Sequence, residues 1–360
     1  MTQFRVPSLP ESLRSAGCDC GRVLTRRGFM ASAVSGLAAT KLLAAPALAQ
    51  PAHARIDFHH HLSPPTFKDA LRKMNLGDGP SFTWTPQKSI DEMDKAGVTL
   101  ALLSITTPAV AFLGREDARR VARESNEYAA QLRRDFPGRF GALATLPMPY
   151  VDDCLAEIDY ACDVLKADGV GLMTSYGDKW LGAREFTPVL EALDKRGAVT
   201  FVHPSAANCC VNVLPDIAPS LIEYSTDTTH TIANLIFSGA SARAKNIKFV
   251  FSHGGGTMPY LIERFNNLPN SDKRYAAFTS EGVVAEIRRF HYDTAIITHP
   301  APLSALTNLV PMSQIVFGSD FPFRTATKSV AGLKAYFDEA RLNVIDYENA
   351  FRLLPQLRKV

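Results

Sequence analysis

Two histidines at alternate positions, His59 and His61, come at the end of a short apolar run. The run has the composition of a β-strand, and the turn residues Ser63-Pro64-Pro65 follow it. Residues i and i+2 of a strand point to the same side, so His59 and His61 would share one face, with Phe58 and His60 on the other. Two imidazoles side by side form half of a metal site, whereas a surface histidine run is the alternative.

Three more polar residues stand directly after apolar runs. His203 ends Val199–Val202, His253 follows Phe249–Ser252, and Asp320 follows a run that begins at Ile315. One such histidine is more often structural than functional. Four coincidences on four predicted strands favour a shared site, because the carboxyl ends of parallel strands meet at one end of a barrel.

Short apolar runs and amphipathic stretches alternate from residue 55 to the C-terminus. The predicted strands are Arg55–Leu62, Thr99–Ile105, Gly141–Leu146, Val170–Thr174, Val199–His203, Lys248–Ser252, Phe290–Ala295 and Gln314–Gly318. Eight alternations over about 300 residues predict a (β/α)8 barrel, the TIM-barrel fold of the α/β class. A doubly wound open sheet is the rival, but no glycine-rich phosphate turn follows the first strand.

The N-terminal segment differs in composition from the rest of the chain. Arg26-Arg27 precedes a mildly apolar run, residues 31–48, and Ala47-Leu48-Ala49 is a small-x-small cleavage pattern. These features predict a twin-arginine signal peptide over residues 1–49, which would be removed, and a single mature domain over residues 50–360 in the periplasm or outside the cell. A membrane anchor or a buried helix is the alternative.

The whole chain has 360 residues, a formal net charge of +3, 46% hydrophobic and 21% charged residues. This composition is that of a globular protein, and it gives no indication of a nucleic-acid partner or of a membrane span after signal removal. Four cysteines lie beyond the signal segment, namely Cys154, Cys162, Cys209 and Cys210. None has Cys-x-x-Cys spacing, so we expect them to be small buried apolar residues.

The motifs Ile56-Asp57-x-His59-x-His61, Val202-His203-Pro204, Ser252-His253-Gly254-Gly255-Gly256 and Gly318-Ser319-Asp320-Phe321-Pro322 occur in this order. Together they resemble the amidohydrolase superfamily, in the branch of aminocarboxymuconate-semialdehyde decarboxylase. The segments 160–170 and 256–262 are similar to the 6-methylsalicylate decarboxylase group. The resemblance covers nearly all of residues 55–355.

The resemblance implies that one divalent metal is held by His59, His61, His203 and Asp320. Three neutral imidazoles and one carboxylate suit Zn²⁺, with Mn²⁺ as the alternative. His253 would be the acid-base residue beside the metal, and Asp320 could also carry the proton. The predicted fourth strand ends without a lysine that could be carbamylated, which favours one metal over two.

The resemblance also implies a metal-dependent decarboxylase of an aromatic or enoic carboxylic acid, such as a hydroxybenzoate. Arg264 would reach a carboxylate in a neighbouring subunit of a homodimer, and Arg324 could meet the substrate carboxylate. Asp57 could orient the strand-one histidines or bond only to backbone, and Asp293 is a polar neighbour. A hydrolase of a lactone, ester or amide is the alternative activity, and a non-catalytic binding protein is the third interpretation.

Overall fold

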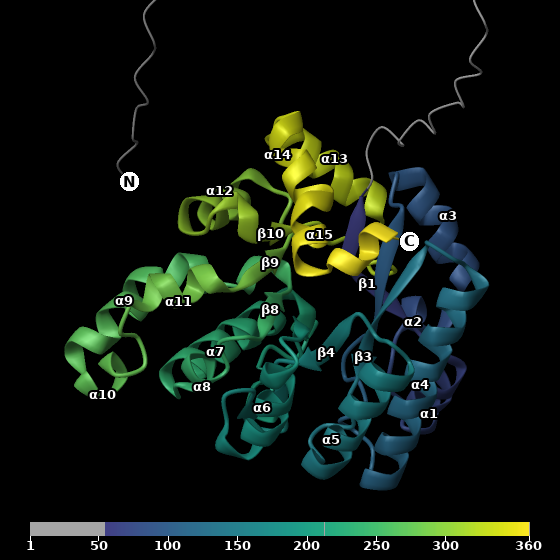
Figure 1. The fold of residues 1–360 in the computed structure, drawn as a ribbon, viewed down its shortest axis with the longest axis horizontal. Helices are drawn as coiled ribbons and strands as arrows, with labels where there is room; N and C mark the ends of the chain where they lie inside the picture. The colour runs from purple at the N-terminus through teal and green to yellow at the C-terminus, as the bar shows by residue number, and fades with distance from the viewer. Residues whose placement is uncertain (1–54, 212, 360) are drawn as a thin grey trace, which may run out of the picture. The chain divides into compact units, whose positions relative to one another are not determined.

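Eight parallel strands form the centre of the computed structural model, which describes residues 55–211 and 213–359 (Figure 1). The predicted signal segment lies outside the described residues. The strands are β1 (Ile56–Leu62), β2 (Leu100–Ile105), β3 (Phe140–Thr145), β4 (Gly169–Met173), β7 (Val199–His203), β8 (Lys248–Phe251), β9 (His291–Asp293) and β10 (Ile315–Val316). Each predicted strand is therefore confirmed, with β9 and β10 shorter than expected.

Backbone hydrogen bonds between β1 and the segment after β10 close the sheet into a barrel. The N–H of Phe58 donates to the carbonyl of Phe317 at 2.9 Å, and that of His61 donates to Phe321 at 2.8 Å. The N–H of Asp320 donates to the carbonyl of His59 at 2.8 Å. The predicted (β/α)8 barrel is thus confirmed, and the open-sheet alternative is wrong.

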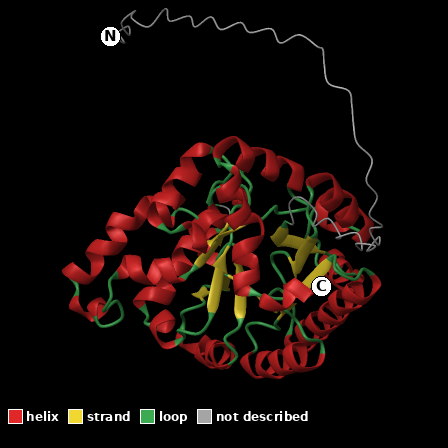
Figure 2. Ribbon diagram, turned by 45° about the horizontal axis from the view of Figure 1, so that its top comes forward, coloured by secondary structure: helices red, strands yellow, loops and turns green. Residues whose placement is uncertain are grey.

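Helices surround the strands (Figure 2). Between β1 and β2 lie α1 (Pro65–Lys73), α2 (Gly79–Thr83) and α3 (Pro86–Ala96), and the short strands β5 (Ser175–Tyr176) and β6 (Lys179–Trp180) form a hairpin after β4. The other α-helices are α4 (Arg115–Asp135), α5 (Val151–Asp159), α6 (Thr187–Lys195), α7 (Glu223–Phe237), α8 (Ala240–Arg243), α9 (Ile262–Ser271), α10 (Lys273–Ala276), α11 (Val283–Arg289), α12 (Pro300–Leu309), α13 (Ala326–Tyr336), α14 (Glu339–Asn343) and α15 (Asn349–Leu353). Within residues 55–211 and 213–359, no helix is both long and apolar enough to cross a membrane.

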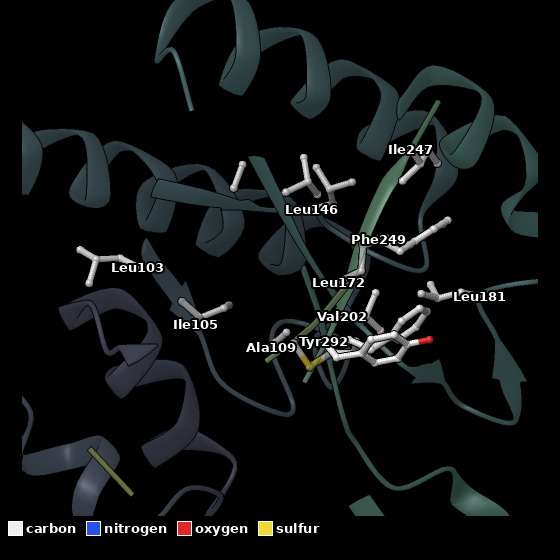
Figure 3. Packing of buried hydrophobic residues seen from close by; sticks show 14 of the residues in the cluster. Leu103, Ile105, Ala109, Leu146, Leu172, Leu181, Val202, Ile247, Phe249 and Tyr292 are labelled. Carbon is white, nitrogen blue, oxygen red and sulfur yellow. The ribbon is translucent and has the colours of Figure 1, made fainter. Parts of the chain in front are cut away.

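Two apolar clusters lie on opposite faces of the strands. The larger one fills the layer between strands and helices and includes Leu103, Val202 and Phe249 (Figure 3). The smaller one fills the barrel interior, where Leu102 and Phe201 meet other inward side chains, and residues of α15 belong to it. The strands alternate between the two clusters because successive side chains point to opposite faces.

A β-bulge in β1 changes this alternation. Asp57 pairs with Ala101 and His60 pairs with Leu103, so Phe58 and His59 together stand opposite one residue. Phe58 therefore joins the interior cluster, although the strand period placed it on the face of His60. The prediction for Phe58 was wrong, because the extra residue shifts the phase, whereas the pairing of His59 with His61 holds.

The environment of the cysteines differs from the sequence prediction in part. Cys154 is buried and Cys162 is half-buried, but Cys209 is exposed and Cys210 is half-buried. The last two lie in a short 3-10 turn after β7, Asn208–Cys210. Burial of all four was expected, and it is wrong for Cys209 and Cys210 because this turn lies outside the strands and helices that pack the core.

A buried ion pair ties the start of β1 to the C-terminal part of the chain. Arg55 donates from Nε to Asp346 Oδ1 at 2.9 Å and from Nη2 to Oδ2 at 2.6 Å. Its Nη1 donates to the carbonyl of Ala96 at 2.6 Å. Both side chains are almost fully buried, so the guanidinium depends on these partners for its hydrogen bonds.

We expect Asp346→Asn to lower the free energy of unfolding by about 3–5 kcal/mol, because it leaves a buried guanidinium without its countercharge. Urea unfolding of the variant and the wild type measures the difference. A loss below about 0.5 kcal/mol, the usual size for a surface change, would show that this pair is not needed for stability.

Candidate metal centre

Four predicted ligands meet at the C-terminal end of the barrel. The structure brings together His59 and His61 of β1, His203 of β7, and Asp320 after β10, all buried, with one ligand atom of each within 4.8 Å of the others. His59 Nε2 lies 3.1 Å from His61 Nε2, and each of these atoms lies 3.1 Å from Asp320 Oδ1. Two atoms that bind one tetrahedral zinc ion at about 2.0–2.1 Å are roughly 3.4 Å apart, so the spacing fits one ion.

The second nitrogen of each imidazole ring fixes its orientation. Nδ1 of His59 lies 2.7 Å from Asp293 Oδ2, that of His61 lies 3.3 Å from the carbonyl of Ser104, and that of His203 lies 2.9 Å from the carbonyl of Pro204. All three partners are acceptors, so each Nδ1 carries a proton, and Nε2 is the nitrogen of each ring that can bind a metal. This is the tautomer that metal-binding histidines need.

The electrostatics of the cluster favour a cation. Burial lowers the pKa of His59, but Asp293 and Asp320 outweigh burial and raise that pKa from 6.5 to about 10. Burial, together with the neighbouring histidines His61 and His59, holds the pKa of His203 well below its usual value. Burial would raise the pKa of Asp320, but the neighbouring histidines hold it well below its usual range. A divalent ion would therefore displace a proton from His59 when it binds.

His253 lies beside the four ligands and is more exposed than they are, at 11% of its side chain. Its Nε2 is 3.4 Å from Asp320 Oδ2, and its ring centroid is 5.0 Å from that of His59. The backbone of His253 has φ +52° and that of Asp320 has φ +67°, both in the left-handed region. Such strain in non-glycine residues concentrates at functional sites.

Asp293 bonds both to the ligand His59 and to His253 beside the ligands, a role that the sequence did not define. Besides its bond to His59, it accepts the N–H of His253 at 2.8 Å and that of Ala295 at 2.9 Å through Oδ1. A Cβ on Gly318 would lie 2.9 Å from Cβ of Asp293 and 3.0 Å from Cβ of His59. The absence of a side chain at Gly318 therefore lets this carboxylate reach the ring.

The signal for Asp293 was present in the sequence. It ends a predicted strand, as the four ligands do, and residue type alone does not separate a ligand from a carboxylate that orients one. A single cluster of this kind occurs within the described part of the chain, in agreement with one metal.

The two predicted substrate-binding arginines lie in different surroundings. Arg324 donates from Nη2 to Thr298 Oγ1 at 2.9 Å, its buried Nε has no partner among the described residues, and its backbone N–H bonds to the carbonyl of Asp320. Arg264 is exposed on α9. It forms no ion pair within residues 55–211 and 213–359, and no hydrogen bond joins its side chain to the four ligands there.

Residues 56–356 match the amidohydrolase protein family. A similar relative is 6-methylsalicylic acid decarboxylase of Penicillium expansum, 33% identical over 322 residues, which span 85% of this chain and 98% of that protein. The 2-amino-3-carboxymuconate-6-semialdehyde decarboxylase of Dictyostelium discoideum is 26% identical over 294 residues, 75% of this chain and 82% of that protein.

A solved structure with the same fold is dihydroxybenzoic acid decarboxylase of Polaromonas sp. JS666, with bound manganese and the inhibitor 2-nitroresorcinol. It is 18% identical, covers 84% of this chain and 97% of its own, and has a TM-score of 0.74. The closed barrel, the four ligands at its carboxyl end and the match over residues 56–356 confirm the resemblance seen in the motifs. The chain belongs to the amidohydrolase family.

Proposed function

We propose that this protein is a metal-dependent, non-oxidative decarboxylase of an aromatic carboxylic acid such as a hydroxybenzoate. One observation carries the proposal. His253 lies beside the complete set of four metal ligands but does not belong to that set. The named relatives, which are decarboxylases at up to 33% identity over most of the chain, support this reaction over hydrolysis. An enoic acid is the alternative substrate class.

The donor set favours Zn²⁺, with Mn²⁺ as the alternative. Imidazole suits zinc, and the carboxylate of Asp320 is a ligand that manganese also accepts. When bound, the ion would supply positive charge to hold the substrate carboxylate and a neighbouring hydroxyl. The bound manganese of the dihydroxybenzoic acid decarboxylase supports the second choice.

The proton comes from residues of this chain. His253 would donate a proton from its ring to the carbon that bears the carboxylate, and the C–C bond would then break. The electron pair of that C–C bond returns to the aromatic ring of the substrate, and CO2 leaves. The proton that departs with the product is replaced from solvent, to which His253 is partly exposed, and Asp320 Oδ2, 3.4 Å from His253 Nε2, would accept a hydrogen bond from the protonated imidazole.

Two neighbours of the cluster suit an aromatic acid. The ring of Phe323 is 38% exposed, and its centroid lies 5.6 Å from that of His61, so it offers an apolar face next to the ligands. Arg324 has no carboxylate partner among the described residues, and we assign to it the substrate carboxylate.

We further propose that the enzyme is a homodimer in which Arg264 serves the site of the other subunit. Arg264 is exposed without an ion pair in the described part of its own chain, and the nearby Tyr260 is 88% exposed. An exposed cation and an exposed aromatic ring are residues that interfaces favour.

Export by the twin-arginine route is also our proposal for residues 1–49, which lie outside the described residues. The support is the arginine pair, the mild apolar run and the Ala-x-Ala site. Replacing Arg26-Arg27 by Lys-Lys should stop export to the periplasm, and unaffected export would remove the assignment.

The activity is tested by offering the purified, metal-loaded enzyme hydroxybenzoates, enoic dicarboxylates and lactones. We expect CO2 from a hydroxybenzoate and no acid from the lactones, with metal content measured on the same sample. Acid released from lactones without CO2 from any carboxylate would replace the decarboxylase with a hydrolase. Binding without turnover of any compound would favour a non-catalytic protein.

A pair of substitutions separates metal binding from proton transfer. His59→Ala should lose metal and turnover together, because it removes a ligand. His253→Ala should keep its metal while kcat falls by about 10²–10⁴, the usual contribution of general acid-base catalysis. Elemental analysis and steady-state kinetics measure both. Loss of metal from His253→Ala as complete as from His59→Ala would make His253 a ligand.

Mixed subunits test the role of Arg264. Arg264→Ala and His253→Ala should each be nearly inactive alone. Mixed dimers contain one site with both native residues, so co-expression should restore roughly a quarter of the wild-type activity. Dimers in which both subunits carry His253→Ala provide the control, because neither of their sites contains the histidine. No recovery in dimers shown to be mixed would place Arg264 outside the partner site.

A further inference from the structure

Asp57 is a fully buried carboxylate that binds no metal in the proposed site and is surrounded by donors. Its Oδ1 accepts the N–H of His59 at 3.0 Å and that of Ser319 at 2.9 Å. Its Oδ2 accepts the hydroxyl of Ser319 at 2.5 Å and lies 3.1 Å from Nδ1 of His60. Four donors satisfy the carboxylate without a countercharge.

These bonds replace main-chain pairing on both sides of the barrel seam, which is the join between β1 and the segment after β10. The bulge in β1 sets Phe58 and His59 against one residue of β2, which disrupts the ladder at the N–H of His59. On the other side, β10 ends at Val316, so the backbone of Ser319 lies beyond the strand. Asp57 accepts hydrogen bonds from the N–H groups of both segments, those of His59 and Ser319.

Both segments carry metal ligands. His59 is itself a ligand, and Ser319 precedes Asp320, whose backbone has φ +67°. A left-handed conformation is unfavourable for an aspartate and persists only where neighbours fix it. Movement of Ser319 would therefore change the distance between the Asp320 carboxylate and the imidazole of His59.

His60, the middle histidine of the run, bonds to Asp57 Oδ2 and also contacts residues on the side away from the metal ligands. It is fully buried, with Nε2 2.9 Å from Ser89 Oγ and its ring stacked on Phe321 at a centroid distance of 4.9 Å. Ser89 Oγ accepts the indole N–H of Trp84 at 2.9 Å. The one proton of the Ser89 hydroxyl is then free to bond His60 Nε2, which leaves Nδ1–H to donate to Asp57.

We propose that Asp57 and His60 are positioning residues for the metal centre, which set the spacing between the ligands of β1 and the ligand Asp320. The inference rests on the proposed metal site and not on the reaction. His60 thus faces away from the ligands, as its place on the strand predicted, but it is not a passive core residue. Removing it should weaken metal binding without removing a ligand.

Metal affinity tests the proposal. Asp57→Asn replaces one acceptor oxygen by an NH2 group that would face the donors of Ser319 and His60. We expect the Kd for Zn²⁺, titrated into the metal-free protein, to rise by about 10–100-fold, as for other residues that orient ligands. The thermal stability of the metal-free protein is measured in parallel.

Asp346→Asn is the matched control, since Asp346 is also a buried carboxylate. It accepts hydrogen bonds from the side chain of Arg55, which directly precedes β1, but bonds no metal ligand. It should lower stability and leave the Zn²⁺ affinity unchanged. A similar loss of affinity in both variants would show that Asp57 acts through general stability. Wild-type affinity in Asp57→Asn would also overturn the proposal.

Two replacements of His60 add a rescue test. His60→Phe keeps a ring but removes both nitrogens, so it should weaken Zn²⁺ binding as Asp57→Asn does. His60→Asn returns an amide N–H near the position of Nδ1, and we expect it to recover much of the affinity. Equal affinity in the two variants would remove His60 from the proposal. Because no substrate is present, a metal-binding enzyme that releases no CO2 would refute the activity and leave this inference standing.

Discussion

Closure of the barrel is the constraint on which the site depends. His61 and Asp320 are separated by 259 positions in the sequence, yet their ligand atoms lie 3.1 Å apart because β1 and the segment after β10 are bonded as neighbours. An open sheet would leave these two strands at opposite edges, and the four ligands could not converge. The hydrogen bonds that close the barrel between β1 and the segment after β10 therefore also bring the metal ligands together.

Buried carboxylates that are not ligands fix the residues around this join. Asp293 orients the ring of His59 and the backbone of His253. Across the barrel, Asp227 of α7 accepts the hydroxyl of Thr174 at 2.5 Å and the indole N–H of Trp180 at 2.6 Å, and Thr174 accepts the N–H of Ser205, two residues after His203. Each carboxylate is fully bonded, so burial costs little and the loops that carry ligands gain defined positions.

Local patterns in the sequence were enough to predict the eight strands, the barrel and the types of residue at the strand ends. Apolar runs with period two are local signals, and a polar residue after such a run is visible without any knowledge of its neighbours. His203 and Asp320 could be placed in one shared site in this way, because parallel strands all deliver their carboxyl ends to the same rim. Their role as ligands was implied by the resemblance of the motifs to the family. The choice of His253 as the residue beside the metal came from its motif, not from periodicity.

Tertiary structure alone decided the features that depend on contacts between distant segments. The bulge in β1 moved Phe58 into the barrel, because register is set by pairing with β2 and not by the strand's own period. The sequence left Asp57 open between orienting the histidines and bonding only to backbone, and it placed His60 only on the face away from the ligands. Their bonds to Ser319 and Ser89 exist only once the barrel has closed and the insertion after β1 is in place. Local patterns indicate which residues point inward wherever a strand keeps its regular period, whereas bulges and the hydrogen bonds that set distances between ligands come from segments that meet only in the folded chain.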